Sequence, residues 1–139
     1  MQFCGTVSHQ LDGKNRIRIP KKFRKDLGDE YYFVAGSQGC IGVYPKAALE
    51  ERLEALKSIR ASEPQKLLAK RKIESSVEEV NEDDQGRTLL PQPLRAHAGI
   101  EKDVVTIGMG DYLEIWSKEA FDKLNASISV DEAYELVGF

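Results

Sequence analysis

Residues that support catalysis, metal binding or cross-linking are scarce in this sequence. It has two cysteines, Cys4 and Cys40, and two histidines, His9 and His97, among 139 residues. Structural zinc sites usually place two cysteines or two histidines a few residues apart. Here the cysteines are 36 positions apart and the histidines 88. We therefore interpret the four as unrelated residues, and we expect no metal site and no cofactor.

Long apolar runs are also missing. No run approaches the roughly 20 residues that span a bilayer, although 41% of the residues are hydrophobic, which is enough for a globular core. The first residues lack a basic region followed by an apolar stretch, so we expect no secretory signal. These absences predict a cytoplasmic protein without a membrane-spanning helix. They favour free thiols over a disulfide between Cys4 and Cys40.

The net charge of −3 argues against a nucleic-acid partner, but the distribution of charge does not. Positive charge gathers near the start of the chain, and negative charge gathers in a later segment. The positive group is Lys14, Arg16, Arg18, Lys21, Lys22, Arg24 and Lys25, and the negative group is Glu74, Glu78, Glu79, Glu82, Asp83 and Asp84. Because salt confines the field of a charge to about 10 Å, a local basic patch can bind phosphate on a protein of negative net charge.

A segment near the start of the chain returns in degraded form in the second half. Residues 11–24 read LDGKNRIRIPKKFR and residues 82–95 read EDDQGRTLLPQPLR. Asp, Arg, Pro and Arg recur in the same order, 71 residues later. The equivalent pairs are Asp12 and Asp83, Arg16 and Arg87, Pro20 and Pro91, and Arg24 and Arg95. The chain is therefore predicted to contain one supersecondary unit written twice.

Each copy is predicted to begin with a strand, a tight turn and a second strand. In the first copy, residues 3–11 favour a strand and Asn15 tolerates the positive φ of a tight turn, where Gly86 stands in the second copy. Residues 16–19 alternate with period two, so Ile17 and Ile19 should face a core while the arginines face outward.

Proline and glycine punctuate the remainder of each copy. Pro20 and Pro91 suit the first turn of a short helix, and Gly28 and Gly99 suit its end. A hairpin and further helices follow. We expect hairpins at residues 31–44 and 104–116, helices at 45–59, 65–72, 117–124 and 129–138, and the first strand of the second copy at 76–83, although propensity alone favours a helix there.

These elements predict an α+β fold that is mainly β. We expect a first half at residues 1–53, a helical connector at 54–73, a second half at 74–124 and a tail at 125–139, all within one compact domain. The connector carries a basic run of Lys66, Lys70, Arg71 and Lys72. Such a run is typical of a solvated helix face, and a second phosphate contact is the alternative interpretation.

An Asp followed four residues later by an Arg at a strand-turn-strand junction has two interpretations. In the first, Asp12 stabilises the turn and pairs with Arg16, and Asp83 does the same for Arg87, with exposed pairs contributing about 0 to 1 kcal/mol. In the second, each Asp holds its loop rigid so that the Arg reaches DNA. The planar guanidinium matches both phosphate and the O6/N7 edge of guanine.

The order of these motifs resembles the MraZ family of bacterial transcriptional regulators over essentially the whole chain. The family has two Asp-x-x-x-Arg loops, each with Pro four residues after the Arg, and a late Gly-x-x-x-x-Leu-Glu-Ile-Trp segment. The last of these lies here between Gly108 and Trp116. Many relatives have Gly where this chain has Asn15, and Asn can adopt the same backbone conformation.

The resemblance implies a swapped-hairpin fold of the AbrB type, a double barrel of two interlocked pseudo-symmetric halves. It also implies a ring-like homo-oligomer that is associated with the nucleoid and binds double-stranded DNA. In this family the Asp-x-x-x-Arg loops bind repeated boxes in the promoter of the protein's own division and cell-wall gene cluster. Carried over, the DNA-binding residues are Lys14, Arg16, Arg18 and Arg87, and the loop-organising residues are Asp12, Asn15, Asp83 and Gly86.

Three other functions are alternatives to DNA-dependent regulation. An AbrB-type antitoxin would need a toxin-binding tail, and this tail is short and partly apolar. A hydrolase would need a nucleophile beside an oriented base, whereas His9 and His97 lie at non-matching positions of the two copies. A scaffold without a nucleic-acid role would leave the basic first loop unexplained. We expect neither enzymatic activity nor a small-molecule substrate.

Overall fold

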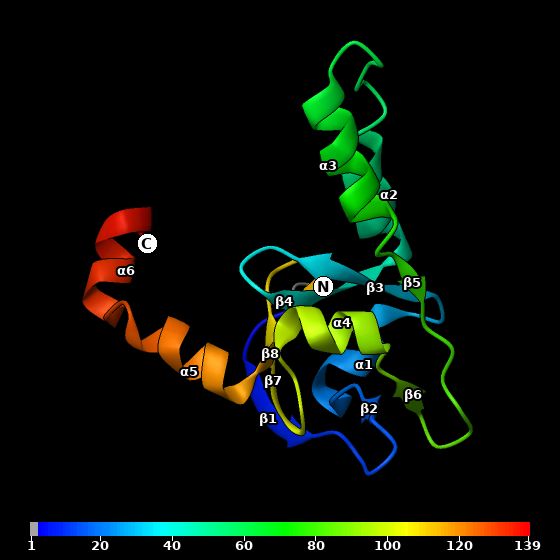
Figure 1. Cartoon of the computed structure of the whole chain (residues 1–139). Coiled ribbons are helices and arrows are strands. Elements are labelled where there is room, and N and C mark those ends of the chain that lie inside the picture. The colour runs from blue at the N-terminus through cyan, green and yellow to red at the C-terminus, as the bar shows by residue number, and fades with distance from the viewer. Residues whose placement is uncertain (1–2) are drawn as a thin grey trace.

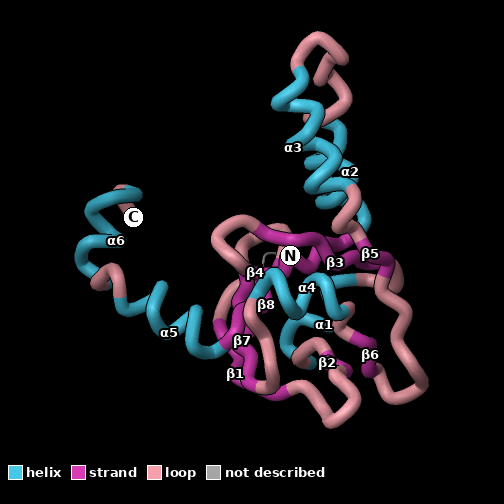
Figure 2. The backbone as a smooth tube through the Cα atoms, viewed as in Figure 1, coloured by secondary structure: helices cyan, strands magenta, loops and turns pink. Residues whose placement is uncertain are grey.

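The computed structural model describes residues 3–139 and has an α+β fold built on antiparallel sheet. The strands are β1 (Thr6–Gln10), β2 (Arg16–Arg18), β3 (Tyr31–Gly36), β4 (Cys40–Pro45), β5 (Glu78–Glu79), β6 (Arg87–Leu89), β7 (Asp103–Gly108) and β8 (Leu113–Ser117). The helices are α1 (Lys21–Leu27), α2 (Lys46–Glu54), α3 (Pro64–Glu74), α4 (Gln92–Ala98), α5 (Lys118–Ala126) and α6 (Val130–Val137). Six strands form one sheet in the order β1-β7-β8-β4-β3-β5, and β2 pairs with β6 in a second sheet (Figures 1 and 2).

The short helices expected between each proline and the following glycine are present. Pro20 and Pro91 are extended residues, and α1 and α4 begin directly after them. Gly28 and Gly99 end these helices with φ values of 78° and 62°, which glycine adopts without steric cost. The helices α1 and α4 each bury two apolar residues, and both help to cover the core.

In the strand after each tight turn, buried and exposed residues alternate as predicted. Ile17 and Ile19 are buried, while Arg18 between them is exposed. Thr88 and Leu90 take the equivalent buried positions in the second copy. One core cluster contains residues from both copies, so neither copy has a separate core.

Strand pairs connect the two copies of the repeat in both sheets. The first strand β1 pairs with β7 of the second copy, and β5 pairs with β3 of the first copy. In the small sheet Arg16 lies opposite Leu89, Ile17 opposite Thr88 and Arg18 opposite Arg87. Because equivalent residues are 71 positions apart, exchanging the two copies maps this set of pairs onto itself. The Ile17–Thr88 pair therefore marks a local pseudo-twofold axis.

Two predicted elements are shorter in the structure than in the sequence interpretation. The helix expected over residues 45–59 ends at Glu54, because the backbone then makes bonds of three-residue reach from Leu56 to Leu53 and from Ile59 to Leu56, which tighten the chain into turns. The strand expected over residues 76–83 forms a ladder only at β5. The prediction of its type was correct, and the prediction of its length was wrong.

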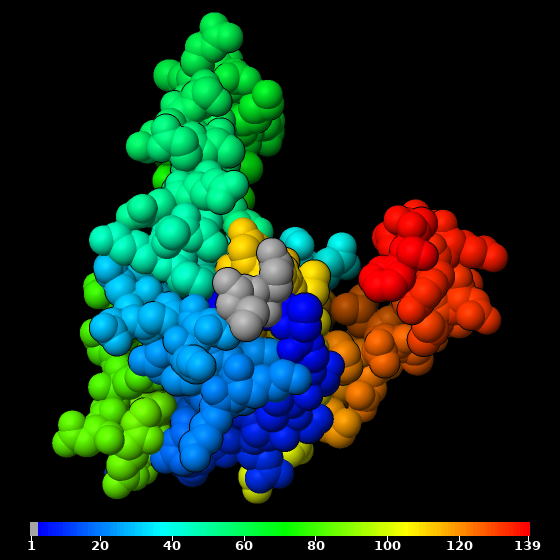
Figure 3. Space-filling model, turned by 180° about the vertical axis from the view of Figure 1, so that it is seen from behind, coloured from blue at the N-terminus to red at the C-terminus, as the bar shows by residue number. Residues whose placement is uncertain are grey.

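Two helical extensions leave the sheets in different directions. We call the pair α2 and α3, with the turns between them, the helical arm; it projects from the β3 side of the large sheet (Figure 1). The helices α5 and α6 extend from the end of β8 on another side (Figures 1 and 3). Ser117 caps α5, and Ser129 with Glu132 forms a capping box at α6, both as expected. In residues 3–139, no helix is both long and apolar enough to cross a bilayer.

Candidate nucleic-acid interface

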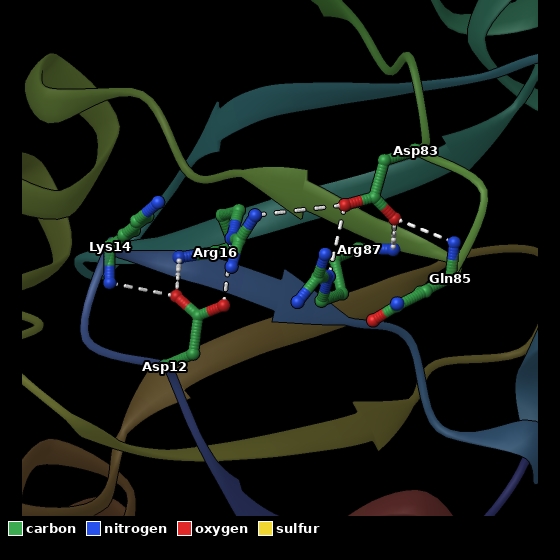
Figure 4. Close-up of polar contacts among 6 residues, drawn as sticks. All are labelled: Asp12, Lys14, Arg16, Asp83, Gln85 and Arg87. Atoms are coloured by element: carbon green, nitrogen blue, oxygen red, sulfur yellow. Dashed lines mark hydrogen bonds and ion pairs between the residues drawn. The ribbon is translucent and has the colours of Figure 1, made fainter.

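The first Asp-x-x-x-Arg loop is organised around one carboxylate. Asp12 Oδ1 accepts hydrogen bonds from the backbone N–H of Lys14 (2.9 Å) and of Arg16 (3.0 Å). Its Oδ2 accepts a bond from Arg16 Nε at 2.8 Å (Figure 4). The backbone closes the same turn, because Asp12 N–H donates to Arg16 O and Asn15 N–H donates to Asp12 O. Asn15 has a φ of 59°, the conformation expected from its type.

The second loop repeats this geometry atom by atom. Asp83 Oδ1 accepts bonds from the backbone N–H of Gln85 and Arg87, both at 2.9 Å. Its Oδ2 accepts a bond from Arg87 Nε at 2.9 Å. Gly86, with a φ of 75°, stands at the position of Asn15. Both sequences therefore fold into one loop shape, and backbone N–H groups donate most of the hydrogen bonds that fix it.

Hydrogen bonding lowers the pKa of both loop aspartates. The backbone N–H of Arg16, with help from the N–H of Lys14 and the Arg16 side chain, lowers the pKa of Asp12 from 3.8 to about 2. The backbone N–H of Arg87 acts in the same way and lowers the pKa of Asp83. At neutral pH each aspartate is therefore a permanent acceptor for its arginine.

Pairing of β2 with β6 brings the two loops side by side. Arg16 Nη1 lies 3.8 Å from Asp83 Oδ2, so the first arginine also faces the second aspartate (Figure 4). Within the described part of the chain, no matching ion pair joins Arg87 to Asp12. The pseudo-symmetry of the backbone is thus broken in the side chains.

Three arginines share one face of the small sheet. Residues opposite each other in an antiparallel pair point to the same face, so Arg16, Arg18, Arg87 and Leu89 lie together, with Ile17 and Thr88 buried on the other face. We call this set of four residues the arginine face. Lys14 is exposed in the adjoining first loop. In the second copy the equivalents of Lys14 and Arg18 are Gln85 and Leu89, so positive charge is concentrated on the side of the first copy.

A network of hydrogen bonds that the sequence interpretation missed lies beside the second loop. Glu82 accepts bonds from Arg24 Nε at 2.8 Å and Arg24 Nη2 at 2.9 Å, and Tyr31 also donates to it. Burial opposes ionisation of Glu82, but these donors outweigh it and lower the pKa of its carboxyl group. Glu82 occurs in a run of acidic residues that resembles a solvated surface. Only its alignment with Leu11, which is buried, could have indicated that the position faces inward.

The remaining residues with reactive side chains have structural partners or lie apart. A ring nitrogen of His9 is 2.8 Å from Thr106 Oγ1, and one of His97 is 2.8 Å from Gly36 O. Cys4 is exposed and Cys40 is buried, and both are free thiols. Across residues 3–139, no group of three or more His, Cys, Asp or Glu side chains is arranged to hold a metal ion.

Comparison with known proteins agrees with the presence of an internal repeat. The family model described as "MraZ protein, putative antitoxin-like" matches residues 2–72 and again residues 75–135, which correspond to the two copies. A protein of Clostridium acetobutylicum named "Transcriptional regulator MraZ" is 42% identical over 129 residues, covering 93% of this chain and 90% of the relative. Proteins of the same name from Heliobacterium modesticaldum and Lachnoclostridium phytofermentans are 41% and 37% identical, covering 96% and 94% of this chain and 94% and 91% of those relatives. The chain belongs to the MraZ family.

Proposed function

We propose that this protein is a DNA-binding transcriptional regulator whose arginine face enters the major groove. The observation that carries the proposal is the gathering of Arg16, Arg18 and Arg87 on one face of a two-stranded sheet, opposite the face that is buried. A two-stranded β-ribbon fits the major groove, and arginine is the side chain that most often reads guanine there. The relatives named transcriptional regulators support the same conclusion.

The loop aspartates have a defined part in this mechanism. Asp12 and Asp83 each accept a bond from Nε of their own arginine. The Nη atoms are then the ones that face a phosphate or a guanine, and Nη1 of Arg16 also lies 3.8 Å from Asp83 Oδ2. Since the aspartates also fix the backbone of both loops, the arginines reach DNA with little loss of conformational freedom, which favours affinity.

We further infer that the chain has the swapped-hairpin arrangement of AbrB-type proteins, with halves at residues 1–53 and 74–124, a connector at 54–73 and a tail at 125–139. Support comes from the exchange of first strands between the copies, in the β1–β7 and β5–β3 pairs, and from the self-complementary β2–β6 pairing. In this proposal a ring-like homo-oligomer presents many arginine faces to repeated boxes in the promoter of the protein's own gene cluster. The protein acts at the nucleoid and has no enzymatic activity.

A binding experiment with one DNA box tests the role of the arginine face. A labelled fragment from upstream of the gene is titrated with wild-type protein, with the double variant Arg16→Ala/Arg87→Ala, and with the control Lys118→Ala/Lys123→Ala. The control removes the same charge from exposed positions on α5. Losing two base contacts of about 1–3 kcal/mol each should weaken binding by roughly 30-fold or more. We expect the control to bind like the wild type, and equal binding by the arginine variant would exclude this interface.

Salt dependence gives an independent measurement. Each neutralised phosphate contributes a slope of about −0.9 to the plot of log affinity against log salt concentration. We expect a steep negative slope for the wild type and a shallower slope for Lys14→Ala, which lacks one exposed charge. A flat dependence for the wild type would rule out binding to the DNA backbone through these loops.

A further inference from the structure

One apolar side chain lies among the arginines of the arginine face. Leu89, the last residue of β6, is 57% exposed. Its neighbours in the chain, Thr88 and Leu90, are buried, so they and not Leu89 help to fill the interior of the protein. A single exposed leucine is common on protein surfaces, and exposure alone therefore indicates little. What distinguishes Leu89 is its position among charged side chains on a surface proposed to bind DNA.

Strand pairing places Leu89 directly beside a proposed DNA contact. It lies opposite Arg16 in the small sheet, while Arg18 lies opposite Arg87. Residues opposite each other in an antiparallel pair have Cβ atoms about 4.5–5.5 Å apart. Successive bases along a DNA strand are about 3.4 Å apart. A base next to one that Arg16 contacts therefore lies within reach of Leu89.

The first copy of the repeat shows that the strand folds without a leucine at this position. The shift of 71 residues aligns Leu89 with Arg18, and both are the exposed third residue of a three-residue strand. The two strands have the same pattern of buried and exposed residues. Because an arginine serves equally well in the first copy, the leucine is not required for folding, which favours a role in recognition.

The major groove offers one apolar group to such a side chain. Thymine carries a methyl group at C5, which lies in this groove, and apolar side chains contact it there. Arginine, in contrast, pairs with the O6 and N7 atoms of guanine. We propose that Leu89 contacts the methyl group of one thymine that adjoins a guanine bound by Arg16. The inference rests on the proposed function, in which the arginine face enters the major groove.

This contact makes recognition by the two copies unequal. Arg18 can donate hydrogen bonds to guanine or phosphate, whereas Leu89 at the equivalent position can only bury an apolar group. The small sheet therefore recognises its site in one direction, although its strand pairing has a pseudo-twofold axis. The absence of a cation from this position of the second copy is accompanied by a gain in specificity for one T·A base pair.

Removal of the methyl group from the DNA tests the contact without any change to the protein. In a labelled fragment with one box, each thymine is replaced in turn by deoxyuridine, which lacks the C5 methyl group and keeps every hydrogen-bonding group. The full chain is titrated with each fragment. We expect one replacement to weaken binding about fourfold, the effect of losing one buried methyl group. The other replacements should have little effect.

Variants of Leu89 assign this effect to one side chain. Leu89→Ala withdraws the side chain from the base, so it should bind the thymine fragment about fourfold more weakly and should bind the thymine and deoxyuridine fragments equally. Leu89→Ile keeps an apolar side chain of the same size and should keep part of the preference for thymine. The control Leu68→Ala truncates a 58% exposed leucine of α3, and it should keep the full preference. Circular dichroism checks that each variant is folded.

Two results would overturn the inference and leave the proposed function intact. One is a wild type that binds every deoxyuridine fragment as tightly as the thymine fragment. The other is a Leu89→Ala variant that keeps the wild-type preference, because the methyl group would then contact another residue. In both cases the wild type still binds DNA, and the Arg16→Ala/Arg87→Ala variant tests the arginine face independently. A wild type that does not bind the fragment at all would overturn both proposals.

Discussion

Each loop aspartate uses both carboxylate oxygens within its own loop. Asp12 binds two backbone N–H groups through Oδ1 and one guanidinium through Oδ2, and Asp83 does the same. The two interpretations of the Asp-Arg spacing are therefore compatible, since an ion pair that stabilises the turn also orients the arginine. The second interpretation also requires that the oriented arginines contact DNA. The titration with the Arg16→Ala/Arg87→Ala variant measures whether they do.

The low pKa of Asp12 predicts how the first loop responds to acid. A carboxylate whose pKa falls from 3.8 to about 2 on folding adds stability above pH 4, and this contribution is lost as the pH falls toward 2. At pH 3 only about a tenth of the folded chains should carry a protonated Asp12. We expect the backbone amide signal of Arg16 in NMR spectra to change little between pH 6 and pH 3.

The variant Asp12→Asn supplies the comparison for this titration. It removes the ionisable group, so its free energy of unfolding should fall less steeply than that of the wild type between pH 4 and pH 2. An Arg16 amide that titrates with a midpoint near 3.8 would show that the hydrogen bonds to Asp12 do not hold in solution.

Backbone conformation at Gly86 gives a second prediction for a single residue. Its φ is 75°, and a Cβ added there would meet no atom within 4 Å, so a substitution changes strain without creating a clash. Gly86→Ala should lower the free energy of unfolding by about 1–2 kcal/mol, the cost of the left-handed region for an L-residue. Urea denaturation measures the change.

Two controls separate strain from other effects of the substitution. Gly86→Asn copies the residue that occupies this conformation in the first loop, and it should cost less than Gly86→Ala. Gly13→Ala adds a methyl group to the other loop, where φ is not positive and no atom lies within 4 Å, so its effect should be small. Equal losses for Gly86→Ala and Gly86→Asn would contradict the strain argument.

At the scale of elements, the contact between α1 and the second loop depends on one carboxylate. Arg24 of α1 binds both oxygens of Glu82, and Tyr31 of β3 binds one of them. The side chains of Arg24 and Glu82 are 32% and 18% exposed. Glu82→Gln should lower the free energy of unfolding by about 1.5–3 kcal/mol, the range for hydrogen bonds to charged groups.

Glu79→Gln is the matched control for this variant. It removes the same charge from an exposed position in the same acidic segment, so we expect a change within about 0.5 kcal/mol. If both variants unfold at the same urea concentration, the Glu82 network does not stabilise the contact between α1 and the second loop.

The elements differ in how far the sequence could predict them. Pro20, Gly28, Pro91 and Gly99 act locally, so the bounds of α1 and α4 were predictable from residue type alone. The end of α2 at Glu54 was not, because no breaker follows it and the chain tightens through backbone bonds. The shape of each tight turn follows from Asp, Gly and Asn chemistry. The proximity of the two turns depends on pairing between strands 71 residues apart, and only the repeat indicated it.

The inward role of Glu82 illustrates what sequence patterns omit. Charged residues in a run usually face solvent, and five neighbours of similar charge gave no reason to separate this one. Its partner Arg24 was identified only as a member of the basic group and of the repeated motif. The equivalent Arg95 donates instead to the backbone carbonyl of Leu90, so the repeat conserves the arginine while its partner changes.

At the level of the whole molecule, the pairing of the strands is symmetric between the two copies and the charge is not. The Ile17–Thr88 pair relates the two loops, yet the exposed cations Lys14 and Arg18 have Gln85 and Leu89 as their equivalents. The first loop should therefore contribute more binding energy than the second. In the proposed homo-oligomer, several moderate contacts on one DNA molecule would give high apparent affinity and compensate for a weak second loop.

Multivalent binding predicts a dependence on the spacing of boxes. In the proposed ring, neighbouring copies would present their arginine faces in a fixed relation, so boxes on the same side of the double helix should bind best. We expect two boxes separated by a whole number of turns, about 10.5 base pairs each, to bind the wild type tenfold or more tightly than one box. Insertion of about five base pairs should remove most of this gain, and insertion of about ten should restore part of it.

The variant Leu136→Glu/Val137→Glu is the control for the source of this gain. It retains Arg16, Arg18 and Arg87 and changes two exposed apolar residues of α6, so a loss of the preference for whole turns in this variant would assign the gain to contacts made by α6. A variant that still prefers whole turns would mean that the preference arises within one chain, from its two loops, and not from contacts between copies. A wild type indifferent to spacing would show that the arginine faces of neighbouring copies are not held in a fixed relation.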